Sequence, residues 1–192
     1  MTKQYLRSQR TKRRIEQSLL KLLQDVPLGK ITVAQICTTA TVSRSTFYAH
    51  YYDKYAVLET VVAAETERFA DLLKARFAAG QVVDVQATVG PVFKWLLATP
   101  QVTQTLLRIH EPRADFGANL QAILTAQFEH FLDEHADKTK LTIPLNYLAT
   151  QYSSWVMTEL TYQLNHQTTA GLLAFSQRVQ SELFKMAGIT LT

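Results

Sequence analysis

Polar side chains of the types that bind nucleic acid gather between residues 32 and 48. Arg44 could donate two parallel hydrogen bonds to a guanine edge, and a hydroxyl beside free backbone N–H groups at a helix start suits a phosphate oxygen. Thr32 and Ser43 stand where helix starts are expected. The candidate contact residues by type are Thr32, Ser43, Arg44, Ser45, Thr46 and Tyr48.

The charge of the chain is unevenly distributed, and this polar stretch lies in its basic part. Residues 1–54 contain ten Lys or Arg and three Asp or Glu, a net charge of +7, whereas the remaining 138 residues carry −3. We call residues 1–54 the head. Its positive charge predicts a polyanionic partner, either nucleic acid or an anionic membrane surface. The apolar residues of the head fall at core spacing and leave no apolar face for membrane insertion, which favours nucleic acid. We expect the basic run Arg10–Arg14 to contact backbone phosphates.

Composition argues against several other classes of protein. Cys37 is the single cysteine and lies on an apolar stripe, so we expect a buried side chain and neither a disulfide nor a redox sensor. The five histidines show no paired metal-ligand spacing, and there is no Gly-rich phosphate loop or nucleophile elbow. We therefore expect no metal, no cofactor and no enzymatic activity.

No segment of the sequence has the pattern of a membrane or export signal. The first 30 residues lack an apolar run of the secretory type. The longest charge-free run, Leu141–Thr158, contains Pro144 and Asn146 and is too polar to span a bilayer. We expect a reducing, cytoplasmic location and no membrane partner.

Apolar residues recur at helical spacing along the chain, and no stretch alternates as a strand would, so the sequence predicts an all-α fold. Thr32, Ser43 and Asp53 are expected to cap the second, third and fourth helices, and Gly80 to close the fourth. The expected helices cover 8–26, a short segment after Thr32 through Ala40, 44–50, 53–79, 91–98, 101–110, 119–137, 144–166 and 171–187.

The second and third helices, joined by about three residues, predict a helix-turn-helix, whose last helix enters the major groove of DNA. The residues that carry this pattern are Ile31-Thr32-Val33-Ala34-Gln35-Ile36, then Ala40-Thr41-Val42-Ser43-Arg44-Ser45-Thr46-Phe47-Tyr48-Ala49-His50-Tyr51-Tyr52-Asp53-Lys54, and Leu58. They closely resemble the DNA-binding domain of the TetR/AcrR family over residues 8–68. The resemblance implies that Lys54 grips a phosphate and that the groove is faced by Arg44, Ser45, Thr46, Tyr48, Ala49 and His50.

The same resemblance implies the domain organisation. Residues 1–54 would form a three-helix DNA-binding domain, and residues 55–192 a helical effector-binding and dimerisation domain. Thr41 stands where the family usually has glycine, so a β-branched residue must accept the turn. Lys54-Tyr55-x-x-Leu58 resembles a subgroup that includes regulators of dihydroxyacetone kinase operons, some of which act as coactivators through a partner protein.

The last two expected helices carry almost no charge, because Glu159 is the only acid or base from Leu141 to Gln177 apart from His166. Helices on the outside of a monomer would show charged faces, so we favour a homodimer interface over a buried core pair. The resemblance agrees, because members of the family pair through their last two helices. The expected interface residues are Tyr152, Trp155, Glu159, Tyr162, Leu172, Phe175, Val179 and Leu183.

Aromatic side chains in the body could line a cleft for a small effector. The acidic balance of the body disfavours an anionic ligand, so we expect a small, largely apolar or aromatic effector that is neutral or cationic. The candidate pocket residues are Trp95, His110, Phe116, Phe128, Phe131, Tyr152 and Trp155.

These features predict a ligand-responsive repressor that binds a pseudo-palindromic operator of double-stranded DNA as a homodimer. One alternative is a coactivator that works through a partner protein, which would bind its operator weakly in isolation. A second alternative is an enzyme, for which the sequence offers no motif.

Overall fold

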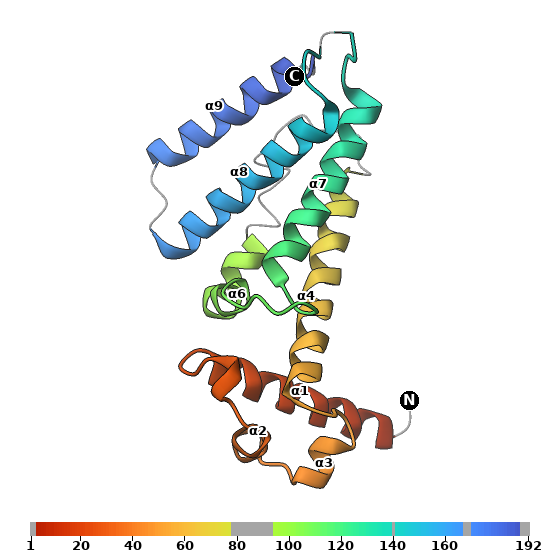
Figure 1. The fold of residues 1–192 in the computed structure, drawn as a ribbon, viewed down its shortest axis with the longest axis vertical. Helices are drawn as coiled ribbons and strands as arrows, with labels where there is room; N and C mark the ends of the chain where they lie inside the picture. Colours follow the sequence, from red (N-terminus) through yellow and green to blue (C-terminus); the bar gives the residue numbers. More distant parts are fainter. Residues whose placement is uncertain (1–2, 78–93, 140, 167–169, 189–192) are drawn as a thin grey trace. The chain divides into compact units, whose positions relative to one another are not determined.

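A computed structural model describes residues 3–77, 94–139, 141–166 and 170–188. All regular elements in these ranges are helical (Figure 1), which confirms the predicted all-α fold class. Residues 94–98 are helical. The labelled elements are α1 (Lys3–Leu23), the 3₁₀ helix η1 (Leu28–Lys30), α2 (Val33–Ala40), α3 (Arg44–Tyr48), α4 (Lys54–Phe77), α6 (Pro100–Leu107), α7 (Phe116–His135), α8 (Leu145–Asn165) and α9 (Ala170–Met186).

The chain divides into two compact units. The first comprises Met1–Glu65 and Thr105–Asp115, and the second comprises Thr66–Gln104 and Phe116–Thr192. The division predicted at residue 54 concerns function rather than packing, and it stays a prediction.

The helices of the first unit share an apolar core, in which α2 packs against both α1 and α3. The side chains that build it are fully buried and sit on the apolar stripes of α1, α2, α3 and α4: they are Ile15, Leu19, Ile36, Phe47 and Leu58. Full burial of such a side chain contributes about 1.5–3 kcal/mol to stability. Helix α2 is therefore held between α1 and α3, and Leu58 of α4 is buried as well.

The three predicted caps are all present. Thr32 accepts a hydrogen bond from the Gln35 N–H, and the Gln35 side chain accepts from the Thr32 N–H at 2.8 Å, which completes a capping box. Ser43 accepts from the Thr46 N–H at 3.0 Å, and Asp53 accepts from the Ala56 N–H at 2.8 Å. Each cap satisfies a backbone donor that a helix start would otherwise leave unpaired.

The core of the second unit contains a cluster of aromatic side chains. Phe128 of α7 stacks on Tyr152 of α8 with 3.9 Å between ring centroids, and Phe184 of α9 meets Phe128 edge-on at 5.6 Å. Gln180 donates to the Tyr152 hydroxyl at 2.9 Å, so this buried hydroxyl has a partner. Side chains from three helices therefore meet in one cluster.

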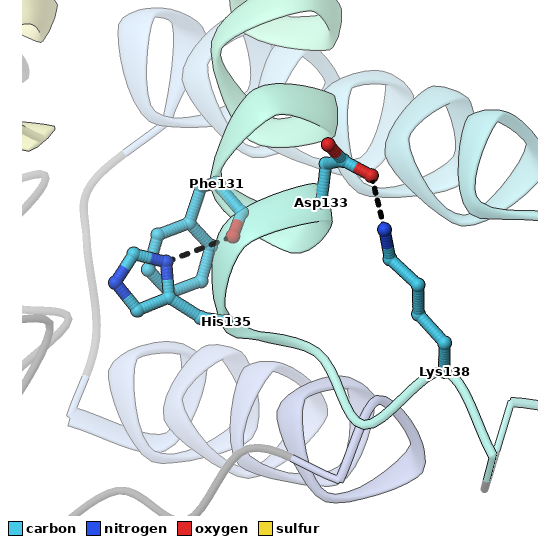
Figure 2. Close-up of polar contacts among 4 residues, drawn as sticks. All are labelled: Phe131, Asp133, His135 and Lys138. Carbon is cyan, nitrogen blue, oxygen red and sulfur yellow. Dashed lines mark hydrogen bonds and ion pairs between the residues drawn. The ribbon is translucent and has the colours of Figure 1, made fainter.

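Contacts between neighbouring residues stabilise the C-terminal end of α7 (Figure 2). His135 Nδ1 lies 3.0 Å from the Phe131 carbonyl oxygen, and the two rings stack at 4.5 Å. The ammonium of Lys138 donates to Asp133 at 2.5 Å, and this hydrogen bond lowers the pKa of the carboxyl. The Asp137 N–H donates to the Ala187 carbonyl at 3.1 Å, which joins this turn to the end of α9.

Several helix ends differ from those predicted. The first helix begins at Lys3 rather than Ser8, because no proline or glycine precedes Ser8 to stop it. The third ends at Tyr48 rather than His50, where the His50 N–H turns back to the Phe47 carbonyl. The predicted closure at Gly80 and the first part of the predicted helix 91–98 lie outside the described residues. None of the described helices is long and apolar enough to cross a membrane.

Candidate functional site

The start of α3 carries a cluster of exposed hydroxyl groups. Ser43 Oγ lies 2.8 Å from both Ser45 Oγ and Thr46 Oγ1, and it also accepts from the Thr46 N–H. Arg44 is exposed beside this cluster. A guanidinium and three hydroxyls at a helix start form a surface that can donate to DNA bases and phosphates.

One buried aromatic side chain attaches α3 to the apolar core of the first unit. Phe47 is fully buried, and its ring meets Tyr48 edge-on at 5.5 Å and Tyr51 at 6.1 Å. Tyr48 itself is 56% exposed. Phe47 faces the core and leaves Tyr48 and Arg44 exposed, whereas Val42 in the preceding turn is half-buried.

The exposure of the predicted contact residues follows the same pattern. Thr32, Ser43, Arg44, Ser45, Tyr48 and Ala49 are exposed, whereas Thr46, His50 and Lys54 are half-buried. Those from Ser43 to Tyr48 lie on α3 and its cap. Thr32 caps α2, where the capping box engages both its hydroxyl and its backbone N–H. The structure therefore brings the α3 residues together and gives Thr32 a local structural role.

The turn between α2 and α3 passes through the left-handed region at Thr41, with φ 53° and ψ 50°. The Thr41 N–H donates to Thr38 and the Val42 N–H to Cys37, which closes the end of α2. Arg14 Nη2 of α1 donates to the Thr41 carbonyl at 3.2 Å. Arg14, predicted to contact phosphates, thus also contacts the backbone of this turn.

The ammonium group of Lys54 is hydrogen-bonded to three backbone carbonyl oxygens. Its Nζ donates to the carbonyl oxygens of Leu28 at 2.7 Å, Gly29 at 3.0 Å and Ile31 at 2.8 Å. The ammonium also lies 5.3 Å from the centre of the Tyr55 ring. Nothing in the local sequence signals these contacts, because the partners are 23 to 26 residues away.

Two residues to which the sequence assigns no role join the segment after α3 to α1. The Tyr51 hydroxyl donates to Glu16 Oε1 at 2.6 Å, and Tyr51 is buried. Burial, followed by the bond to Glu16 and the charge of its carboxylate, raises the pKa of Tyr51 well above its ordinary value. This contact fixes the residues that follow α3.

The predicted effector residues are divided between the two units. His110 belongs to the first unit, where its Nδ1 lies 2.9 Å from Asp115 Oδ2. The other six lie in the second unit, and several pack on aromatic neighbours: Trp95 near Phe69 at 6.3 Å, Phe128 on Tyr152, and Phe131 near Phe184 at 6.0 Å. Trp155 lies 6.0 Å from Tyr152 and is half-buried.

One open hollow among the described residues lies on α7 and α8, and it contains none of the predicted effector residues. Gln121 donates to Ser154 at 3.1 Å within its wall, and the ring of Tyr162 stacks on His166 at 4.2 Å. Its lining consists of Gln121, Ser154, Met157, Thr158, Thr161, Tyr162, Asn165 and His166. The assignment of an effector to the aromatic residues stays a prediction.

The predicted interface residues differ in exposure. Tyr162 and Phe175 are 47% and 58% exposed, whereas Tyr152 and Glu159 are buried. Trp155, Leu172, Val179 and Leu183 are half-buried. Two further large apolar side chains, Tyr147 of α8 and Met186 of α9, are also exposed. Both α8 and α9 therefore carry exposed apolar side chains.

Comparison with known proteins finds transcriptional regulators among the similar sequences and structures. No protein-family model matches the sequence. An uncharacterized HTH-type transcriptional regulator, YxbF of Bacillus subtilis (strain 168), is 26% identical over 180 residues, which are 86% of this chain. The chain spans 42% of the length of that relative.

Solved structures extend the likeness over nearly the whole chain. A TetR transcriptional regulator from Streptococcus agalactiae 2603V is 25% identical, with a TM-score of 0.66 over 92% of this chain and 96% of that one. The resemblance to TetR-family transcriptional regulators is thereby confirmed, and the protein has their architecture. The dihydroxyacetone kinase operon activator DhaS is 15% identical, with a TM-score of 0.56 over 93% of this chain and 96% of that one. This likeness concerns the fold alone, so the narrower resemblance to that subgroup stays a prediction.

Proposed function

We propose that the protein is a cytoplasmic, ligand-responsive transcriptional repressor that binds operator DNA through α3. The observation that carries this proposal is the exposed surface of α3, with Arg44 and three hydroxyls above the buried Phe47. A helix fixed by a buried aromatic side chain can present a guanidinium to a base edge with little loss of order on binding. The net charge of +7 on residues 1–54 supports a polyanionic partner.

The protein would bind as a homodimer through α8 and α9. Phe175 and Met186, both more than half exposed, are eleven residues apart on α9, which is about three helical turns and places them on one face. A second copy would cover this apolar surface and that of Tyr162. A two-fold dimer presents two copies of α3, which predicts an operator of two inverted half-sites.

Release from DNA would follow from a shift in population. A small effector held in the second unit lowers operator affinity if it binds better to dimers whose two heads do not match the spacing of the half-sites. The aromatic side chains of the second unit favour an apolar or aromatic ligand.

The experiment that tests this function is selection of bound sequences from random double-stranded DNA with the purified protein. The expected result is a single pseudo-palindromic motif. The control is the Arg44→Ala variant, which should enrich a motif with weaker preference at one position of each half-site. Failure of the unaltered protein to enrich any motif would contradict direct, sequence-specific binding.

A further inference from the structure

Two cationic side chains from different helices reach the backbone at opposite ends of α2. At the N-terminal end, Lys54 of α4 donates to the carbonyls of Leu28, Gly29 and Ile31, directly before the cap Thr32. At the C-terminal end, Arg14 of α1 donates to the carbonyl of Thr41. The helix that precedes the recognition helix is therefore held at both of its ends.

The contacts of Lys54 use the full donor capacity of the side chain. A lysine ammonium has three N–H donors, and three carbonyl oxygens lie within 3.0 Å of Nζ. A DNA phosphate could bind Nζ only by displacing one of these carbonyls, which would then lose a charge-assisted hydrogen bond. The geometry is that of a structural cation closing the turn formed by η1.

The contact of Arg14 lies at the one described non-glycine residue with a positive φ. Thr41 is β-branched and adopts φ 53°, a conformation that L-residues with branched side chains disfavour. The strained residue connects α2 to the cap of α3, so its conformation determines the direction in which α3 leaves the turn. A hydrogen bond to its carbonyl from a different helix stabilises the strained conformation.

We propose that Lys54 and Arg14 are positioning residues for DNA recognition: they hold the turns at the two ends of α2, and through them the orientation of α3, rather than binding phosphates. This inference rests on the proposed function for its effect on DNA, whereas its effect on the fold of the head does not depend on DNA. It changes the role that the sequence assigns to both cations.

The first test measures thermal unfolding without DNA. Lys54→Met keeps the aliphatic stem and removes the three donors, and we expect its Tm to fall by about 5 °C or more. Lys21→Met removes the same charge from an exposed site on α1 and should leave the Tm unchanged. Equal Tm values for Lys54→Met and the unaltered protein would overturn the structural role of Lys54, whether or not the protein binds DNA.

Lys54→Arg provides a second variant in case Lys54→Met does not fold. Arginine keeps the positive charge and can still reach a phosphate, but its planar fork does not match three carbonyls that converge on one point. We expect a lower Tm for Lys54→Arg as well. An unchanged Tm would contradict the three-carbonyl site.

The second test measures how operator affinity depends on salt. A residue that binds phosphate in both subunits should reduce the slope of log affinity against log salt by about two when it is neutralised. We expect Lys54→Met to weaken binding with an unchanged slope. A slope that becomes shallower by about two would show that Lys54 binds phosphate and would overturn the proposal for this residue.

The third test is rescue at Thr41. Arg14→Ala should weaken operator binding by about tenfold and lower the Tm, because the strained turn loses its hydrogen bond. Thr41→Gly accepts the left-handed conformation without strain, so Arg14→Ala combined with Thr41→Gly should regain most of both losses. Absence of rescue in both measurements would show that Arg14 does not act through the turn. Failure of the proposed function would appear differently, as an unaltered protein that binds no DNA although the Tm rescue is intact.

Discussion

The hydroxyl of Tyr51 donates to the carboxylate of Glu16 at 2.6 Å, across 35 residues of sequence. Tyr51 follows α3, and Glu16 lies on α1. The bond connects the segment after α3 to α1, and the rings of Phe47 and Tyr51 also pack against each other there. The orientation of α3 therefore depends on a polar contact as well as on the apolar core.

Tyr51→Phe should lower the stability of the protein without abolishing folding. The variant loses a hydrogen bond to a charged group, which contributes about 1.5–3 kcal/mol, while the buried ring is kept. Denaturant unfolding at neutral pH measures the loss. Tyr52→Phe, a neighbouring exposed site, is the matched control and should change stability little.

The same contact predicts a dependence of stability on alkaline pH. The pKa of Tyr51 is raised in the folded protein, chiefly by burial. The protonated hydroxyl therefore makes its full contribution to the free energy of unfolding below the ordinary tyrosine pKa of about 10, and this contribution is lost as the pH rises further. The stability of the unaltered protein should decline more steeply above that pH than that of Tyr51→Phe. Parallel declines would contradict the assignment.

Arg44→Ala should change sequence preference as well as affinity. If the guanidinium reads a base edge, its loss costs about 1–3 kcal/mol of binding and relaxes one position in each half-site. Arg10→Ala, in the basic run expected to contact phosphates, should weaken binding to all sequences alike, because a phosphate contact carries no sequence information. Competition assays with operator variants distinguish the two patterns, and an Arg44→Ala protein with unaltered preference would remove Arg44 from the base-reading residues.

Phe175→Glu should convert the proposed dimer into a folded monomer. The side chain is 58% exposed in one protomer, so a charge there is tolerated by the single chain but becomes buried without a partner, twice by symmetry, in the proposed interface. Sedimentation at micromolar concentration measures the state of assembly. Gln177→Glu adds the same charge to another exposed site of α9 and should remain dimeric if it lies outside the interface. A dimeric Phe175→Glu protein would place the interface elsewhere.

The effector should be detectable through the two tryptophans. An apolar or aromatic ligand bound near Trp95 or Trp155 should quench their fluorescence and lower operator affinity through a coupling of about 1–3 kcal/mol. Trp95→Phe and Trp155→Phe identify which tryptophan responds. Quenching without any change in operator affinity would separate the ligand from regulation.

Features that depend on near neighbours could be predicted from the sequence. The caps Thr32, Ser43 and Asp53 bond to residues three positions away, and the buried faces of α1 and α2 follow from helical spacing. The partners of Lys54, Arg14 and Tyr51 lie 23 to 35 residues away. The basic run suggested a phosphate contact for Arg14, and the family resemblance suggested one for Lys54. The placement of His110 in the first unit likewise depends on tertiary structure that periodicity does not contain.

The central claim is that the basic head binds DNA, and the salt dependence of operator affinity tests this claim most directly. If the dimer contacts six to ten phosphates, affinity for the selected operator should fall about 10³- to 10⁵-fold between roughly 50 and 200 mM salt. Residues 1–54, with ten Lys or Arg against three Asp or Glu in each subunit, carry enough charge for this number of contacts. An affinity that stays nearly constant over this range would contradict binding of DNA by this head.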